Sequence, residues 1–155
     1  MQALRLILAL TLISFLPLSA NPLERAKKDA ETIKNRLVAA KVGGAGLKSV
    51  VVSPDGKTAL INFLAGANLT KTARQKMAYR DALTLAKETF GALGSIETVE
   101  VTALLQPKQG LPLHWIKTQI PRADFKKLNW QRIKRDYAAI EAFLRAKGKL
   151  QVMGG

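Results

Sequence analysis

The amino-acid sequence predicts an α+β fold, with a small antiparallel or mixed sheet of three to four strands and helices packed on one face. Helix-like and strand-like segments are interspersed along the chain in the order α-β-β-α-β-(β)-α. Two of the strand-like segments are joined by a short turn, which indicates a hairpin. Residues 21–155 have a length that suits a single domain with one core.

The first twenty residues have the three parts of a secretory signal peptide. Arg5 precedes the apolar run of residues 6–16, Pro17 interrupts that run, and the small residue Ala20 ends the segment. The run is shorter than the roughly 20 residues that cross a bilayer. We therefore predict cleavage after Ala20 and export to the periplasm, the cell envelope or the medium, with an uncleaved anchor as the alternative. The sequence contains no cysteine, which excludes disulfides and lipid attachment through a thiol.

A helix is predicted to begin directly after the signal peptide. Asn21 is suited to cap it, Pro22 to occupy its first position, and Glu24 to complete a capping box. Spacings of three and four residues then place one narrow apolar stripe on the helix, formed by Leu23, Ala26, Ala30, Ile33 and Leu37. The glycine-rich segment 43–46 is predicted to end the helix rather than to cradle phosphate, because no strand precedes it.

Residues 47–53 and 58–65 are predicted to form the hairpin, with Asp55 as a turn residue. A second helix is predicted from Thr72 to Phe90, with Thr72 and Gln75 as a capping pair. The helical period gives this helix a buried arc of Ala78, Tyr79, Ala82, Leu83, Leu85, Ala86 and Phe90.

The C-terminal part is predicted to add two strands and a helix. Residues 95–105 alternate as a half-buried strand does, and residues 113–120 are predicted to form a strand at the sheet edge because Pro112 cannot donate to a ladder. One helical turn is predicted within residues 121–127, followed by a helix over residues 129–148. Its apolar stripe contains Trp130, Ile133, Tyr137, Ile140 and Leu144, so its aromatic side chains are predicted to belong to the core.

Residues 21–105 resemble a BON domain, the α-β-β-α-β module of bacterial envelope proteins. The resemblance rests on the opening helix, on VVVSPDGKTALINFLAG as a hairpin with glycine in its turn, on the helix from Thr72, and on the strand entry ALGSIETVEV. It implies an exported module that binds phospholipid surfaces or other proteins, and it supplies no catalytic motif. A secretin-type ring-building module has a similar order of elements. Residues 106–155 would then be a C-terminal loop, strand and basic helix added to the BON-like unit.

Candidate catalytic groups are few. His114 is the only histidine, which excludes a zinc site built on several histidines. The serines of residues 21–155 (Ser49, Ser53 and Ser95) lie outside any nucleophile-elbow pattern. We therefore predict no cofactor, no metal and a binding function rather than catalysis. A wall-polymer hydrolase stays open as an alternative, because a pair of distant carboxylates leaves no spacing signal.

The formal net charge of +14 indicates an anionic partner, although a basic surface also serves solubility alone. We predict association with an anionic phospholipid surface or cell-wall polymer, or with an envelope protein. An exported or surface-located nucleic-acid-binding protein is the alternative. The candidate anion-binding residues are Lys76, Arg80 and Lys87 on the second predicted helix, and Arg132, Lys134, Arg135 and Arg145 near the C-terminus.

Overall fold

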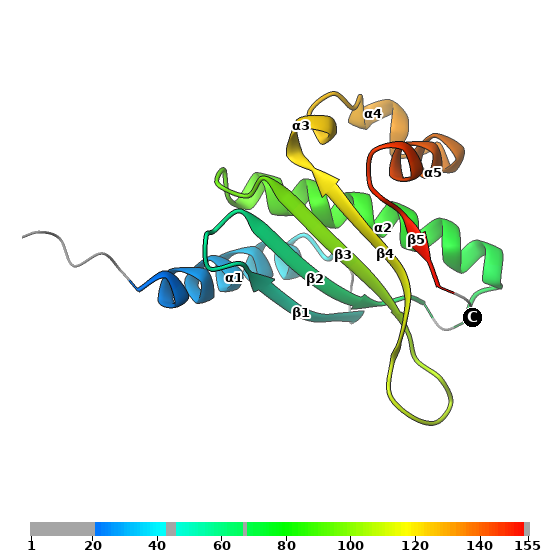
Figure 1. Ribbon diagram of the computed structural model, residues 1–155. Coiled ribbons are helices and arrows are strands. Elements are labelled where there is room, and N and C mark those ends of the chain that lie inside the picture. Colours follow the sequence, from blue (N-terminus) through cyan, green and yellow to red (C-terminus); the bar gives the residue numbers. More distant parts are fainter. Residues whose placement is uncertain (1–20, 43–45, 67, 154–155) are drawn as a thin grey trace, which may run out of the picture.

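The computed structural model describes residues 21–42, 46–66 and 68–153. The predicted signal peptide of residues 1–20 and most of the glycine-rich segment lie outside the described residues. The described chain is α+β, as predicted, with helices packed on a mixed sheet (Figure 1). In chain order its elements are α1 (Pro22–Ala39), β1 (Leu47–Val52), β2 (Thr58–Leu64), α2 (Lys71–Ala92), β3 (Thr98–Leu105), β4 (Leu113–Pro121), α3 (Arg122–Phe125), α4 (Trp130–Ile133), α5 (Tyr137–Ala146) and β5 (Gln151–Val152).

The sheet has five strands rather than the predicted three to four, because β5 adds to β4, and the strands lie in chain order from β1 to β5. The predicted β1–β2 hairpin is antiparallel, as are the β3–β4 and β4–β5 pairs. The β2–β3 pair is parallel because α2 carries the chain back across the sheet between them. The prediction that β4 is an edge strand is wrong, since β5 pairs with Ile116 and Lys117. Pro112 precedes β4 and therefore does not limit its pairing.

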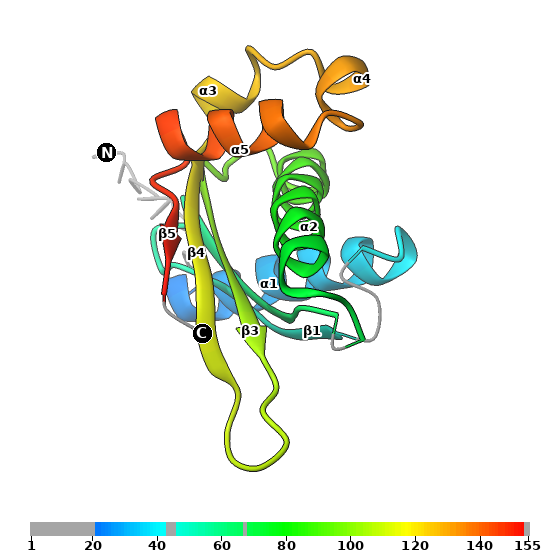
Figure 2. The same ribbon diagram turned by 90° about the vertical axis from the view of Figure 1, so that its right-hand side faces the viewer.

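The helices α1 and α2 form a layer on one face of the sheet, and α5 packs on α2 (Figure 2). The first contacts β1 and α2, and α2 in turn contacts β3, β4 and α5. Figure 2 shows α2 lying along the face of the sheet and α5 crossing over α2. None of the helices among the described residues is long and apolar enough to span a membrane.

The core between these layers follows the predicted alternation in β2 and at the start of β3, whereas residues 101–104 of β3 are all buried. In β2 the side chains of Ala59, Ile61 and Phe63 are buried, and in β3 those of Val99 and Val101. All seven residues of the predicted arc of α2 are buried, together with Thr89. Their burial is the main source of hydrophobic stabilisation.

The two long helices begin at side-chain caps. The Asn21 side chain accepts from the Leu23 N–H at 3.1 Å, as predicted, but the Leu23 side chain is 58% exposed. Figure 1 shows the start of α1 projecting beyond the strands, so the buried part of its stripe starts one turn later. The predicted capping pair of α2 is wrong by two residues. Thr70 is the cap, and Gln75 instead donates to the Tyr79 hydroxyl at 2.6 Å.

The predicted C-terminal helix is two helices. Asp136 interrupts it and caps α5 by accepting from the Ala139 N–H at 3.0 Å. The predicted stripe nevertheless faces inward, because Ile133, Ile140 and Leu144 are buried. Trp130 packs against the core but is only half-buried. The aromatic residues of this segment therefore border the core rather than fill it.

Candidate anion-binding site

The candidate cations of α2 lie beside the C-terminal helices. The Nζ of Lys87 lies 5.5 Å from the centre of the Trp130 ring in α4. One guanidinium nitrogen of Arg80 donates to the Tyr137 hydroxyl of α5 at 3.5 Å. The bases of the two segments are far apart in the sequence, and the fold packs α5 on α2 and brings Trp130 of α4 to Lys87. We call the candidate cations of these helices and of the turn after α4 the basic helical face: Lys76, Arg80, Lys87, Arg132, Lys134, Arg135 and Arg145.

Most of the positive charge of the described chain belongs to the segments around this face. Residues 122–149 contain nine basic and three acidic residues, and α2 contains five basic and two acidic ones. In contrast, α1 contains five basic and three acidic residues. The α2 and C-terminal segments together therefore carry a net charge of +9, and their electrostatic field attracts anions.

Part of this charge is balanced by neighbouring carboxylates. Lys87 donates to Glu88 at 2.6 Å, and Glu88 also accepts from Arg36 of α1 at 3.0 Å. The hydrogen bond from Lys87 lowers the pKa of Glu88, so its carboxylate stays charged. Arg145 makes hydrogen bonds of 2.9 and 2.7 Å to Glu141 on α5. These pairs leave Lys87 and Arg145 less available to a ligand.

Arg80 has a weaker local partner. Its Nε lies 4.0 Å from a carboxylate oxygen of Asp81, and its side chain is 41% exposed. Burial raises the pKa of Asp81, with Arg80 acting against that shift. The guanidinium of Arg80 thus contacts α5 and Asp81 and is partly exposed to solvent.

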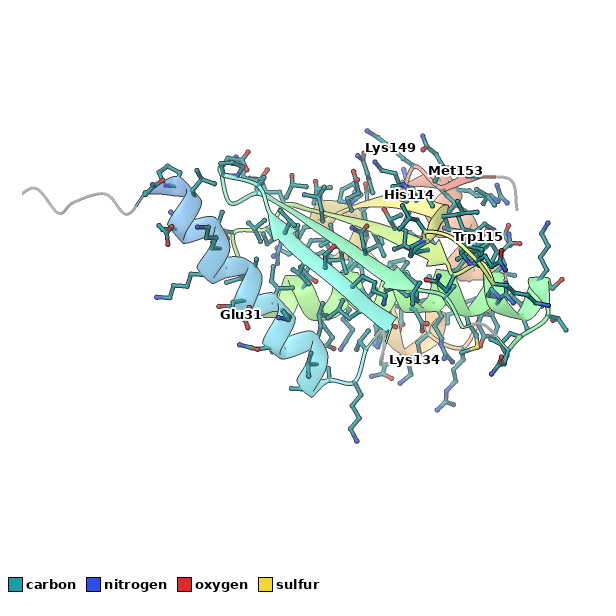
Figure 3. The ribbon with its side chains drawn as sticks, turned by 90° about the horizontal axis from the view of Figure 1, so that it is seen from below. Glu31, His114, Trp115, Lys134, Lys149 and Met153 are labelled. Carbon is teal, nitrogen blue, oxygen red and sulfur yellow. The ribbon has the colours of Figure 1, made fainter. Side chains whose placement is uncertain are left out.

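Four cations of the face carry no ion pair with any described residue. They are Lys76, Arg132, Lys134 and Arg135. Lys134 is half-buried and the other three are exposed. Three of the four follow each other closely on α4 and the turn after it. In Figure 3 Lys134 lies on the opposite side of the molecule from Lys149 and Met153. These four side chains are the part of the face that is available to an anion.

The end of α2 supports α4 through an aromatic cluster. The Phe125 ring lies 5.4 Å from Phe90 and 6.3 Å from Trp130 between ring centres. The Arg122 guanidinium lies 4.6 Å from the centre of the Phe90 ring. The cluster places the backbone of α4, and with it the unpaired cations, against the C-terminal end of α2.

Arg122 has a structural role that the sequence does not indicate. Its guanidinium donates to the carbonyls of Ile96, Phe90 and Leu93, which lie 26 to 32 residues earlier in the chain. Burial lowers the pKa of Arg122. The only local signal is a basic residue directly after Pro121, which does not reveal such distant partners.

Other polar groups lie on the sheet. His114 is exposed in β4. Glu100 is paired with Lys117 at 2.7 Å, and Glu97 with Lys57 at 3.0 Å. Among the described residues, no group of three or more His, Cys, Asp or Glu side chains could hold a metal ion. No protein family model, curated protein or solved structure matches this chain.

Proposed function

We propose that this protein is a non-catalytic binding module of the cell envelope, which associates with an anionic surface through the basic helical face. The observation that carries the proposal is the group Arg132, Lys134 and Arg135, which has no ion pair with any described residue. Each lysine or arginine close to an anionic membrane contributes about 1 kcal/mol of attraction. Three adjacent cations therefore add a localised attraction to the membrane, beyond the general attraction that comes from the net charge.

The attachment of α4 to α2 supports the same proposal. Contacts of Trp130 with Lys87 and Phe125 fix α4 before any ligand arrives. A preorganised group of cations loses less conformational entropy on binding than cations on a loose tail. Binding through exposed charges is screened by salt, so the interaction weakens as ionic strength rises.

The proposed location is outside the cytoplasm. It is supported by the signal-peptide pattern of residues 1–20 and by the resemblance of residues 21–105 to a BON domain. In that location two sources of anionic groups are available, phospholipid headgroups and wall polymers. Both present phosphate or carboxylate oxygens, which bind lysine and arginine side chains in the same way.

Vesicle co-sedimentation tests the proposal. The full chain should bind vesicles of phosphatidylglycerol and phosphatidylcholine but not vesicles of phosphatidylcholine alone. The triple variant Arg132→Gln, Lys134→Gln, Arg135→Gln should bind about a hundredfold more weakly. The matched control is Lys28→Gln, Lys41→Gln, Lys108→Gln, which removes three exposed charges elsewhere. It has the same net charge and should retain most of the binding.

The outcomes separate the possible ligands. Binding to a soluble wall polymer, with the same sensitivity to the triple substitution, identifies the polymer as the source of the anionic groups. Equal losses in the triple variant and its control would show that binding follows net charge, which contradicts a defined face. Binding to duplex DNA with steep salt dependence, and to neither vesicles nor polymer, would contradict the proposal in favour of a nucleic-acid ligand.

A further inference from the structure

We propose a second binding site, at the free edge of β1, which adds an extended acidic segment of a partner protein to the sheet. β1 is the outermost strand of the sheet on its side (Figure 1). The opposite edge is formed by β5, which has two residues, whereas β1 has six. A strand of this length presents unpaired backbone groups that accept another strand.

The hydrogen-bond alternation identifies the backbone groups that face outward. The Ser53 N–H donates to the Thr58 carbonyl at 2.9 Å, so Ser53 is bonded to β2. In an antiparallel pair the backbone groups of every second residue bond to the neighbouring strand. The backbone groups of Val51 and Ser49, like those of Ser53, therefore face β2. The N–H and C=O groups of Val50 and Val52 therefore face away from the sheet. Among the described backbone hydrogen bonds of turns and loops, none involves these two residues.

A groove lies beside this edge, between α1 and β1. It has a volume of about 370 Å³ and is lined by Lys27, Ala30, Glu31, Lys34, Lys48, Ser49 and Val50. Three lysines and one glutamate give its lining a net charge of +2. A strand added to β1 would point alternate side chains toward α1 and into this groove.

Lys48 is directed into the groove by an irregularity of β1. The register passes from Leu47 opposite Phe63 to Ser49 opposite Asn62, so Lys48 has no partner in β2. Such a bulge changes the direction of a side chain at a sheet edge. Lys48 is exposed and has no ion pair with any described residue.

The other two lysines have weakly held partners. The Lys27–Glu24 pair is 3.1 Å long and the Lys34–Glu31 pair 3.8 Å, with every side chain more than half exposed. Exposed pairs of this kind contribute little. A carboxylate of the partner can therefore replace them.

Charge also selects the partner over a second copy of this chain. Two copies paired through β1 would bring two sets of groove lysines together, and like charges across a strand pair are destabilising. Lysine on an edge strand blocks such self-pairing. The same lysines attract a strand with aspartate or glutamate at alternate positions. We therefore infer that an acidic strand of this kind is the partner of the groove.

Fluorescence anisotropy with a labelled peptide of alternating glutamate and valine tests the site. The full chain should bind this peptide, and Lys48→Glu should weaken binding at least about fivefold. The matched control Lys108→Glu reverses an exposed lysine of the β3–β4 loop and should leave binding unchanged. A peptide with lysine in place of glutamate should not bind.

Amide hydrogen exchange locates the bound peptide. The Val50 and Val52 amides should exchange more slowly with the peptide bound. The same protection in the Arg132→Gln, Lys134→Gln, Arg135→Gln variant would show that the site is independent of the basic helical face. No binding, equal binding of the lysine peptide, or protection confined to α4 would overturn the proposal. Dimerisation of the chain alone with protected Val50 and Val52 amides would overturn it in favour of a second copy.

Discussion

The ammonium group of Lys87 lies over the ring of Trp130, 5.5 Å from its centre, and joins the last turns of α2 to α4. The Trp130 ring also lies 6.3 Å from the Phe125 ring, measured between ring centres. Trp130 therefore faces protein on two sides and is only partly exposed. We therefore expect this aromatic residue to fix the position of the cations without itself contacting the ligand.

Replacing Trp130 with alanine should lower the free energy of unfolding by about 2–3 kcal/mol, as measured by urea denaturation. The loss should be smaller than for a fully buried tryptophan, because part of the ring is already in solvent. Trp130→Phe should retain most of the stability. Unchanged stability with vesicle binding abolished would show instead that the ring contacts the ligand.

Glu88 accepts hydrogen bonds from both Lys87 and Arg36, so the stability of the fold should depend on pH. Because the pKa of Glu88 is lowered in the folded state, the stabilisation from its ion pairs is fully present above the ordinary pKa of a glutamate and is lost as pH falls through the lowered folded-state pKa. Glu88→Gln should lower the free energy of unfolding near neutral pH by about 1 kcal/mol and reduce the loss on acidification. Urea titrations across the acidic range measure both effects. Glu31→Gln, which alters an exposed pair, should change neither, and an unaltered acid profile in Glu88→Gln would contradict this role of Glu88.

Gly148 should not tolerate a side chain. A Cβ at this position would lie 2.7 Å from the Thr118 hydroxyl and 2.9 Å from the Leu144 carbonyl. Gly148→Ala should therefore lower the melting temperature, with a loss of about 1–3 kcal/mol. Gly94→Ala is the control, since a Cβ there meets nothing within 4 Å. Equal melting temperatures of the two variants would contradict the packing of α5 against β4.

Replacing Arg122 with glutamine should weaken the connection between α2 and α3. Three carbonyls would lose a charged donor, and charged hydrogen bonds contribute about 1.5–3 kcal/mol each before the rest of the site relaxes. We expect a loss of at least about 2 kcal/mol by urea denaturation. Lys126→Gln, which removes an exposed base nearby, should have little effect. A similar small effect of Arg122→Gln would mean that solvent satisfies these carbonyls.

The parts of the fold that depend on local patterning were predictable from the sequence. Helical periodicity identified every buried residue of α2 except Thr89, since a threonine in an apolar arc has no separate signal. The break between α4 and α5 has no signal in the sequence, because helix-like backbone hydrogen bonds continue through it. The Asp136 N–H donates to the Ile133 carbonyl at 2.9 Å, and Ile140 donates to Asp136 at 3.0 Å, so the apolar stripe keeps its phase.

Features that depend on distant partners could not be predicted. β5 is a strand only because Gln151 and Val152 meet β4, and two residues carry no periodicity. The candidate cations were identified by residue type, but their availability depends on the fold. The pair between Arg145 and Glu141 follows from helical spacing, whereas the link from Glu88 to Arg36 joins residues 52 positions apart.

Amide hydrogen exchange of the full chain on phosphatidylglycerol-containing vesicles tests the central claim most directly. The account predicts slower exchange at Trp130 to Ile133 and at the amides of Lys134 and Arg135, with little change in the β3–β4 loop. Leu111 of that loop is 84% exposed and provides the natural internal comparison. Protection confined to Leu111 and its neighbours would mean that the chain binds through an apolar loop, which would contradict binding through the basic helical face.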